Sequence, residues 1–450
     1  MGDIVHTIFD NEIYNQLSED YEEFKMIESM KVSDSLGRTH NLYLQKSLGP
    51  GSVQYRNPGT TNRAFPSSHQ ASAQEVTVQL KELNTTIEFE QNLYYRAKET
   101  PEKYADRLEI EVSGKAIVTK RRIAADLYGD GSGVIGSINT VSVNSAVANR
   151  AVVTLQAGNT ARGHAGMFEI DEKLIDKTNA GAAGASPTIS AGTFSYWIVT
   201  DRDRAAGTVT LAPVNTLGNT VNVSAWSPAS TDLLYKNEQP TFPDVSGSIT
   251  DYGTLSEAMV GLESWTNDDS RVVFGATMTG AIKGSRYSAA ANAIDAKHFQ
   301  KALDNVKVNV GQGRYSYKMA ISSPETNAAL LESAETDRRF KAEDSASRGF
   351  SGKMTFKHGN DSVALTTSEY CPQKRIYLLP ESKSGRKAVL GYIGTGVEAI
   401  KLPGMDSDGF FLKATSSGYV NMVQSFLQAY GQMVCRHPAA IGVIHNFTNS

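Results

Sequence analysis

The sequence predicts an α+β protein whose parts follow one another in an unusual order, and three observations support this. A Gly/Pro/Ser-rich extended segment from Ser47 to Ser72 leads into an alternating strand that starts at Glu75. A long, heavily charged helix then runs from Pro101 to about Leu127. A β-like stretch poor in charge follows, and a mixed α and β second half closes the chain. Because such a hairpin and so polar a helix have little of their own chain to pack against, we expect both to lie across neighbouring copies of the same molecule.

The bulk composition is that of a globular protein. At 450 residues the chain exceeds the usual size of one domain, so roughly two to four packed units are expected. The net charge of -4 argues against a strongly nucleic-acid-binding surface, which would normally be basic. The only cysteines, Cys371 and Cys435, lie far apart in sequence, which suits a reducing compartment. The N-terminus lacks the apolar region of a signal peptide, and no apolar run could span a bilayer, so we expect a soluble, intracellular protein with no membrane partner.

Short elements precede the long helix. Residues 11–27 predict an amphipathic helix that must dock on something to persist. Its apolar stripe comprises Ile13, Leu17, Tyr21 and Phe24. A strand is predicted over Asn41–Gln45, and Gly/Pro turn signals end it. The next strand is half-buried by its alternation and is renewed further on, with Val76, Val78, Leu80, Ile87 and Phe89 as its inward positions.

The long helix has clear start and stop signals. Thr100 is a suitable N-cap, Pro101 suits the first helical position, and Glu102 lies near the positive end of the dipole. Apolar residues follow at helical spacing, namely Tyr104, Leu108, Val112, Ala116, Ile123 and Leu127. A continuous helix would be about 40 Å long. Gly114 inside it costs about 1 kcal/mol, which leaves a bend or break there as an alternative. The glycine-rich segment Gly129–Gly133 ends it.

Residues 134 to about 235 predict an inserted, compact all-β domain. Small and β-branched residues dominate, and charges are sparse until Glu169. Short strands are predicted at Thr140–Val143 and Ala151–Leu155. A hairpin is predicted from Ser195–Val199 and Thr208–Leu211, joined by a polar turn.

The remaining chain alternates between helix and strand signals. Helices are predicted over Leu255–Trp265 and Ala296–Val306, the second with Phe299, Leu303 and Val306 on one face. A third helix is capped by Ser323-Pro324-Glu325 and runs toward Asp337. Strands are predicted over Tyr317–Ile321, Arg375–Leu379 and Tyr419–Cys435.

One motif suggests a nucleotide site and fails on its context. The segment Gly131–Gly136 matches G-x-G-x-x-G, which requires a preceding strand, a following helix and an acid about twenty residues later. Here a helix precedes it, β-like sequence follows, and no acid lies between Asp130 and Glu169. We interpret the segment as a flexible domain connector. Asp126 and Asp130 miss the spacing of a calcium loop and are interpreted as cap and turn residues.

The search for other chemistry finds no site. The eight histidines form no H-x-x-x-H pair, and Cys435 with His437 supplies too few ligands for zinc. No nucleophile elbow and no P-loop occurs. The basic clusters Lys120–Arg122 and Arg338–Arg339 are interpreted as solvated helix faces, with DNA contact as the minor alternative. We therefore predict no catalytic, cofactor-binding or metal-binding residue, no cofactor, and a protein that is not an enzyme.

Two stretches point to a family. One runs from Asp295-Ala-Lys-His-Phe-Gln-Lys-Ala-Leu through Ser323-Pro324-Glu325 to Asp337-Arg338-Arg339-Phe340. The other runs from Gly418-Tyr419-Val420 through Gln428-Ala-Tyr-Gly-Gln-Met-Val-Cys-Arg-His-Pro-Ala-Ala-Ile-Gly442. With the order of parts, they resemble tailed-bacteriophage major capsid proteins of the HK97 fold, including members with an inserted β domain after the spine helix.

The resemblance implies a division of the chain into parts. These are an N-terminal arm (1–36), an extended loop (37–74), a P-domain strand and spine helix (75–133), an inserted β domain (134–235), a P-domain segment (236–295), an A domain (296–400) and a P-domain return with the C-terminus (401–450). Glycine-rich joints at Gly129–Gly133 and Gly49–Gly51 are expected hinges. Covalent Lys–Asn cross-linking occurs in part of this family, but Lys46 is interpreted as an ordinary exposed lysine, and we predict no cross-linking.

The resemblance also implies a function. It is that of a structural subunit that self-assembles into hexamers and pentamers of an icosahedral head shell around the phage genome. The expected partners are further copies of the chain, with scaffolding, portal and decoration proteins and weak, non-specific contact with packaged double-stranded DNA. The expected location is the virion, after assembly in the bacterial cytoplasm. An encapsulin-type nanocompartment shell is the alternative, followed by a phage tail or filament protein and then by a metabolic enzyme.

Overall fold

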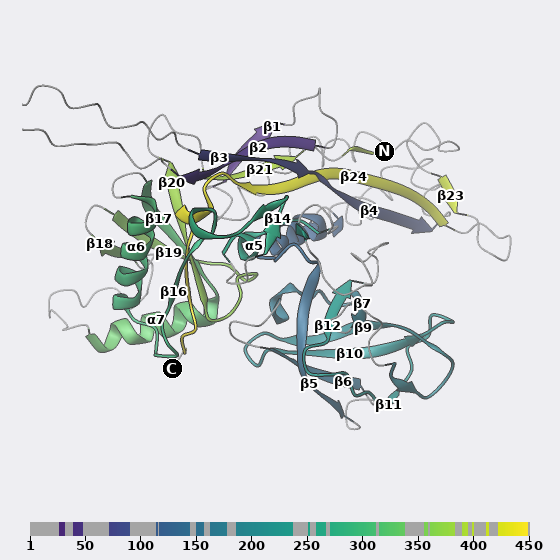
Figure 1. Cartoon of the computed structure of the whole chain (residues 1–450). Coiled ribbons are helices and arrows are strands. Elements are labelled where there is room, and N and C mark those ends of the chain that lie inside the picture. Colours follow the sequence, from purple (N-terminus) through teal and green to yellow (C-terminus); the bar gives the residue numbers. More distant parts are fainter. Residues whose placement is uncertain are drawn as a thin grey trace, which may run out of the picture.

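A computed structural model of the chain gives three regions that Figure 1 separates clearly: an α/β body, a long sheet along one edge, and a β-barrel. The chain is mixed in class and rich in strands. The residues that the structure describes are 27–31, 39–47, 72–90, 114–115, 117–144, 150–156, 163–177, 186–236, 251–252, 258–266, 271–311, 315–337, 355–358, 361–382, 389–394, 398–399, 411–413 and 422–448.

The body is built on a six-stranded mixed sheet. Its strand order is β16 (Ser285–Ser288), β25 (Gly442–His445), β20 (Arg375–Ser382), β17 (Tyr315–Ser322), β19 (Asp361–Thr367) and β18 (Thr355–His358). The predicted strands over Tyr317–Ile321 and Arg375–Leu379 are confirmed as β17 and β20. Residues 375–380 of β20 are all buried, which explains why this sequence reads as an apolar run.

Two predicted helices beside this sheet are confirmed (Figure 1). Helix α6 (Ala296–Val310) starts at Asp295, whose carboxylate accepts hydrogen bonds from the backbone N–H groups of Lys297 and His298 at 2.9 and 3.1 Å. Its buried face includes Phe299, Leu303 and Val306, as the spacing predicts. Helix α7 (Pro324–Asp337) follows Ser323, whose hydroxyl accepts from the N–H of Thr326 at 3.2 Å.

The long edge sheet joins segments from both ends of the chain. Strand β24 (Met422–Cys435), predicted from Tyr419–Cys435, pairs with β4 (Lys81–Glu90) from Met422–Glu90 to Gly431–Lys81. The same strand also pairs with β21 (Leu390–Gly394), β22 (Glu398–Ala399) and β23 (Phe411–Lys413). β1 (Glu28–Lys31) lies parallel to β21. The early strands β1 and β4 are therefore held in place by strands from the last part of the chain.

The predicted hairpin is present at its base and packs on its own subunit. Strands β2 (Thr39–Ser47) and β3 (Ser72–Gln79) are antiparallel, and their inward side chains Leu42, Leu44, Val76 and Val78 are all buried. The side chain of Gln74 donates to the carbonyl of Gly275 at 3.5 Å. The expectation that this hairpin has little of its own chain to pack against is therefore wrong for its base, because the body covers one face. The opposite face exposes Tyr43.

The last turns of the long helix also enter the core. The structure describes residues 114–115 and 117–126 as helix, and the predicted start at Pro101 lies outside the described residues. Side chains from Ile123 to Tyr128 are buried, except that of Asp126, which is partly exposed. The expectation that so polar a helix has little of its own chain to pack against is therefore wrong for its last turns. Ile117 and Val118, one turn earlier, are about half exposed at 49% and 51%.

Helix α5 (Leu262–Thr266) connects this helix end to the body. The N–H of Leu262 donates to the carbonyl of Leu127 at 2.7 Å. The predicted helix over Leu255–Trp265 is thus shorter than expected within the described residues, which include no residue from 253 to 257. Other short elements here are β13 (Asp251–Tyr252), β14 (Val272–Val273), β15 (Ala276–Thr277) and the 3-10 helices Gly280–Ile282 and Pro438–Ala440.

The β-like stretch folds into a closed, six-stranded barrel. The strand order is β10 (Thr208–Asn215), β6 (Arg150–Leu155), β5 (Val134–Asn144), β12 (Leu233–Lys236), β7 (Lys173–Lys177) and β9 (Phe194–Asp203). A two-stranded ribbon of β8 (Thr188–Ile189) and β11 (Val223–Ala225) lies beside it. The β9–β10 hairpin is confirmed. Because the barrel is closed, it has no free sheet edge, and this stretch of low charge can fold as one unit.

Two tryptophans and one carboxylate lie together inside the barrel. Trp197 and Trp226 lie 4.3 Å apart between ring centroids. The Trp197 indole N–H donates to the carboxylate of Asp176 at 3.4 Å. The pKa of Asp176 is raised to about 6. Burial is the main cause and the nearby Asp232 contributes, whereas the hydrogen bonds from the indole groups oppose the rise.

Because of this carboxylate, we expect the barrel to become more stable as the pH falls, which is the reverse of the usual effect of an aspartate. The pKa of Asp176 in the folded state lies above its ordinary value of 3.8, so burying the charged form is unfavourable near pH 7. This penalty begins to shrink as the pH falls below about 6, and it is lost completely only below about 3.8. A pKa rise of about two units corresponds to about 3 kcal/mol at most. We expect the urea midpoint to increase from pH 7.5 to pH 5.5 for the wild type and to change less for Asp176→Asn. Asp201→Asn, at an exposed barrel carboxylate, should keep the wild-type dependence, and equal pH profiles for all three proteins would contradict the assignment.

Several remaining predictions have a definite outcome or lie outside the described residues. The N-terminal helix at residues 11–26 and the cluster Arg338–Arg339 lie outside them, as do Gly49–Gly51. Cys371 and Cys435 are both free and buried. Within the described part of the chain, no helix is long and apolar enough to cross a membrane.

Candidate functional site

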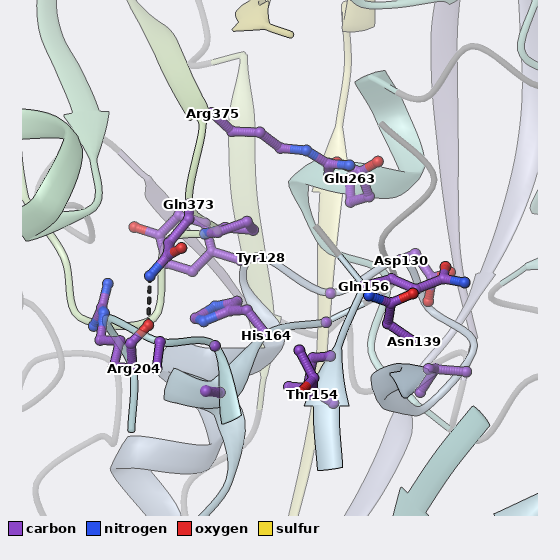
Figure 2. Close-up of a pocket in the computed structure, with 18 residues that line it drawn as sticks. Tyr128, Asp130, Asn139, Thr154, Gln156, His164, Arg204, Glu263, Gln373 and Arg375 are labelled. Atoms are coloured by element: carbon purple, nitrogen blue, oxygen red, sulfur yellow. Dashed lines mark hydrogen bonds and ion pairs between the residues drawn. The ribbon is translucent and has the colours of Figure 1, made fainter. Parts of the chain in front are cut away.

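The barrel meets the body at a polar junction that contains a pocket of about 250 Å³ (Figure 2). Side chains from both regions line it, together with the segment that joins them. The labelled lining residues are Tyr128, Asp130, Asn139, Thr154, Gln156, His164, Arg204, Glu263, Gln373 and Arg375. Several buried ionisable groups, among them Asp130, His164, Glu263 and Arg375, line this junction, so its chemistry decides what the site does.

The connector Gly129–Gly133 is pinned rather than free. The Asp130 carboxylate accepts from the backbone N–H of Ser132 at 2.9 Å, and the Asp130 carbonyl accepts from the Ser264 hydroxyl. The Arg271 guanidinium lies 3.8 Å from the same carboxylate. Asp130 therefore has the turn role that the sequence predicts, but the expected flexible hinge is buried and hydrogen-bonded. The segment also runs from a helix into β5, the reverse of a dinucleotide loop.

His164 fastens one barrel loop to the body. Its Nε2 makes a hydrogen bond with the carbonyl of Tyr370, and its Nδ1 accepts from the N–H of Gly166 at 3.1 Å. The pKa of His164 is lowered to about 3. Burial is the main cause and the neighbouring arginines contribute, whereas the hydrogen bond to Tyr370 acts in the opposite direction. The ring is therefore neutral at neutral pH, with the proton on Nε2, and serves as a fixed link.

Arg204 fastens the β9–β10 turn to the same body loop. Its guanidinium donates to the carbonyls of Glu369, Ser368 and Cys371, the last two at 3.5 Å. Its Nε lies 2.9 Å from the Glu325 carboxylate at the start of α7. In the other direction, the Gln373 side chain donates to the Arg204 carbonyl, which is the dashed line in Figure 2. One turn of the barrel thus exchanges hydrogen bonds with the body in both directions.

A second set of charges lies where the long helix meets the barrel. Arg122 pairs with Asp126 at 3.0 Å on the helix. Lys236 pairs with Glu172, both on the barrel. Burial raises the pKa of Asp126, which nearby cations oppose, and burial lowers the pKa of Lys236. The basic cluster Lys120–Arg122 is therefore only partly a solvated face, because Arg122 is enclosed and paired.

Glu263 and Arg375 form a buried ion pair in the wall of the pocket. The Arg375 guanidinium donates to Glu263 Oε2, and the Tyr377 hydroxyl donates to the same oxygen at 3.0 Å. Burial alone would lower the pKa of Arg375, but the Glu263 carboxylate raises it above its ordinary value. The pair joins α5 to β20, so it ties the end of the long helix to the central sheet.

The arrangement is suited to mechanical coupling. Each charged group described here faces a partner within the protein. In the described ranges, no cluster of three or more His, Cys, Asp or Glu could hold a metal ion. The sequence identified none of these junction residues as a site. The sequence shows Arg375 at the start of an apolar strand and Arg204 in a polar turn. It could not identify their partners, because these lie far away in the chain.

Comparison with known proteins adds a structural likeness. No family model and no curated protein matches the sequence. The cyanophage A-1(L) capsid is similar over 94% of this chain and 90% of its own, with a TM-score of 0.46 and 9% identity. The Mycobacterium phage Patience structure covers 100% and 89%, with a TM-score of 0.38 and 8% identity. The holo-SrpI encapsulin complex from Synechococcus elongatus covers 95% and 88%, with a TM-score of 0.36 and 10% identity. The first structure is a phage capsid, which is the kind of assembly that the sequence resembles. The last is an encapsulin complex, which is the kind of shell that stands as the alternative.

Proposed function

We propose that this chain is the structural, non-catalytic subunit of an icosahedral phage head shell of the HK97 type. The observation that carries the proposal is a hairpin base that is rooted in a long, paired strand. The β2–β3 base leads directly into β4, which is paired with β24 along its whole length. A hairpin anchored this firmly can transmit force from a neighbour into its own subunit, as a shell requires.

The order of the parts supports the same proposal. The β2–β3 hairpin would be the base of the extended loop, the helix ending at residue 126 the spine helix, and the long sheet of β4 and β24 the P domain. The six-stranded sheet with α6 and α7 would form the A domain. The barrel would be the inserted domain, lying between the spine helix and the rest of the P domain.

Exposed apolar side chains on the hairpin and helix support contact between copies. Tyr43 is 62% exposed on the outer face of β2, opposite Glu75 on β3. Ile117 and Val118 are exposed on the helix. Ring closure can use weak contacts of this kind, because several neighbours hold each subunit at once.

Tyr43→Ser tests the proposed contact. We expect the fraction of protein in large assemblies, measured by sedimentation velocity, to fall by about tenfold, since an interfacial tyrosine typically contributes about 1–2 kcal/mol and the contact recurs in every subunit. The free energy of unfolding of the dispersed subunit should change by less than about 0.5 kcal/mol, because the side chain is exposed. Leu217→Ser, at an 80% exposed position on the barrel, is the matched control. Equal assembly by Tyr43→Ser and the wild type would contradict the contact.

The proposal extends to partners and location. The subunit would assemble in the bacterial cytoplasm, with scaffolding, portal and decoration proteins as further partners, and would reside in the virion. Its net charge of -4 fits weak, non-specific contact with packaged double-stranded DNA, because strong phosphate binding would hinder packing and release. An encapsulin-type shell is the second candidate, since it would use the same hairpin and ladder but enclose protein.

A further inference from the structure

We propose that Arg204 is a latch that fixes the orientation of the barrel on the body, so that the barrel and the six-stranded sheet move as one unit. This inference concerns the single subunit and does not depend on the proposed shell function. It assigns a conformational role to the β9–β10 turn, and it excludes the glycine-rich connector as the hinge between the two regions.

The latch is built from complementary geometry on both sides. Asp203 accepts from the N–H of Ala206 at 2.9 Å, and Gly207 adopts a φ of 67°, which together form the tight turn that presents Arg204. The body offers a row of backbone carbonyls from residues 368, 369 and 371, where the chain turns between β19 and β20. A planar guanidinium has the several fixed donors needed to satisfy such a row, whereas a lysine ammonium does not.

The contacts of the latch come from independent parts of the body. Glu325 belongs to the first turn of α7 and lies 2.9 Å from Arg204 Nε. Gln373 precedes β20 and donates to the Arg204 carbonyl. The turn is therefore held by one helix and one loop at once. A rotation of the barrel about its connector would have to break contacts with both.

The junction around the latch is not packed throughout, although one hydrophobic core cluster continues from the barrel into the body. The pocket of about 250 Å³ lies directly beside the latch and is lined by both regions, so this part of the junction is open rather than close-packed. The covalent links at Val134 and Lys236 both lie on the neighbouring strands β5 and β12, which pair with each other. The two links thus act as one attachment point, and Arg204, together with the His164–Tyr370 contact, supplies a second point on another face of the barrel.

The test measures a distance between the two regions. Leu217 on the barrel and Val308 on α6 are each 80% exposed, and both natural cysteines are buried, so spin labels at Leu217→Cys and Val308→Cys can be attached selectively. In the dispersed, full-length subunit we expect pulsed electron–electron double resonance to give one narrow distribution of the distance between the two spin labels. Adding Arg204→Ala should broaden it at least about twofold, and Arg204→Lys should give an intermediate width, because the ammonium retains the Glu325 pairing only.

Controls separate loss of the latch from loss of folding. Arg150→Ala removes another barrel arginine, and the distribution should remain as narrow as in the wild type. Tryptophan fluorescence of Arg204→Ala should be native-like, since Trp197 and Trp226 report on the barrel interior. Were Arg204→Ala to unfold, Glu325→Gln would replace it, and faster amide exchange at residues 368–373 would be the expected result. A folded Arg204→Ala with the wild-type width, or unchanged exchange in Glu325→Gln, would overturn the proposal.

Discussion

Replacing Arg375 with leucine is expected to lower the free energy of unfolding by about 3–5 kcal/mol. The Arg375 and Glu263 side chains are only 5% and 8% exposed, so the substitution leaves a buried carboxylate without its cation. The Tyr377 hydroxyl, 3.0 Å from that carboxylate, cannot replace a full charge. Urea unfolding of the dispersed subunit, followed by tryptophan fluorescence, measures the loss.

Two further variants identify the cause of that loss. The double variant Glu263→Leu/Arg375→Leu removes both charges and should recover much of the stability, because an apolar pair has no desolvation cost. Lys318→Ala breaks an ion pair with Glu381 on the same sheet, where the side chains are 61% and 38% exposed. That change should cost less than about 1 kcal/mol. If Arg375→Leu cost no more than Lys318→Ala, the ion pair would not be the tie between α5 and β20 described above.

Gly261→Ala is expected to cost about 3 kcal/mol or more. A Cβ atom at this position would lie 2.4 Å from the carbonyl oxygen of Asp126 and 2.5 Å from that of Leu127. Both atoms belong to the end of the long helix, where they cannot rotate away as a side chain could. The helix end would have to separate from α5 and give up the 2.7 Å hydrogen bond between Leu262 and Leu127.

The same substitution at a glycine inside the long helix supplies the control. At Gly114 an added Cβ meets nothing within 4 Å, and the residue has helical geometry. Gly114→Ala should therefore stabilise the subunit by up to about 1 kcal/mol. The two glycine variants are predicted to change the urea midpoint in opposite directions. A Gly261→Ala protein as stable as the wild type would show that the helix end does not pack against α5 so closely.

Local signals were sufficient for most elements of the body and barrel. Asp295 and Ser323 cap α6 and α7 as their residue types predict, because a cap needs only a side chain and a backbone N–H a few residues away. The polar turn after Val199 also predicted the β9–β10 hairpin correctly, because a turn between two strands is likewise a local feature of the sequence. Where one face of a strand is buried, alternation alone also placed the inward residues, as at Val76 and Val78.

Long-range contacts account for what the sequence could not provide. Arg204 and Glu369 are 165 residues apart, and Arg375 and Glu263 are 112 apart, so no spacing rule connects them. The polarity of the long helix concealed the burial of its last turns, where Ile123, Leu127 and Tyr128 reach the core. The glycines of the connector suggested flexibility, whereas the hydrogen bonds of Asp130 and Ser264 fix it.

Electron microscopy of the purified, full-length protein tests the central claim most directly. The account predicts closed, icosahedral-looking shells, or spirals and tubes of the same ring-shaped capsomers, whose abundance falls with Tyr43→Ser and not with Leu217→Ser. Smaller closed shells filled with protein would favour the encapsulin alternative. A protein that remains a monomer or small oligomer at high concentration, and still does so when a phage scaffolding protein is supplied, would contradict the shell function.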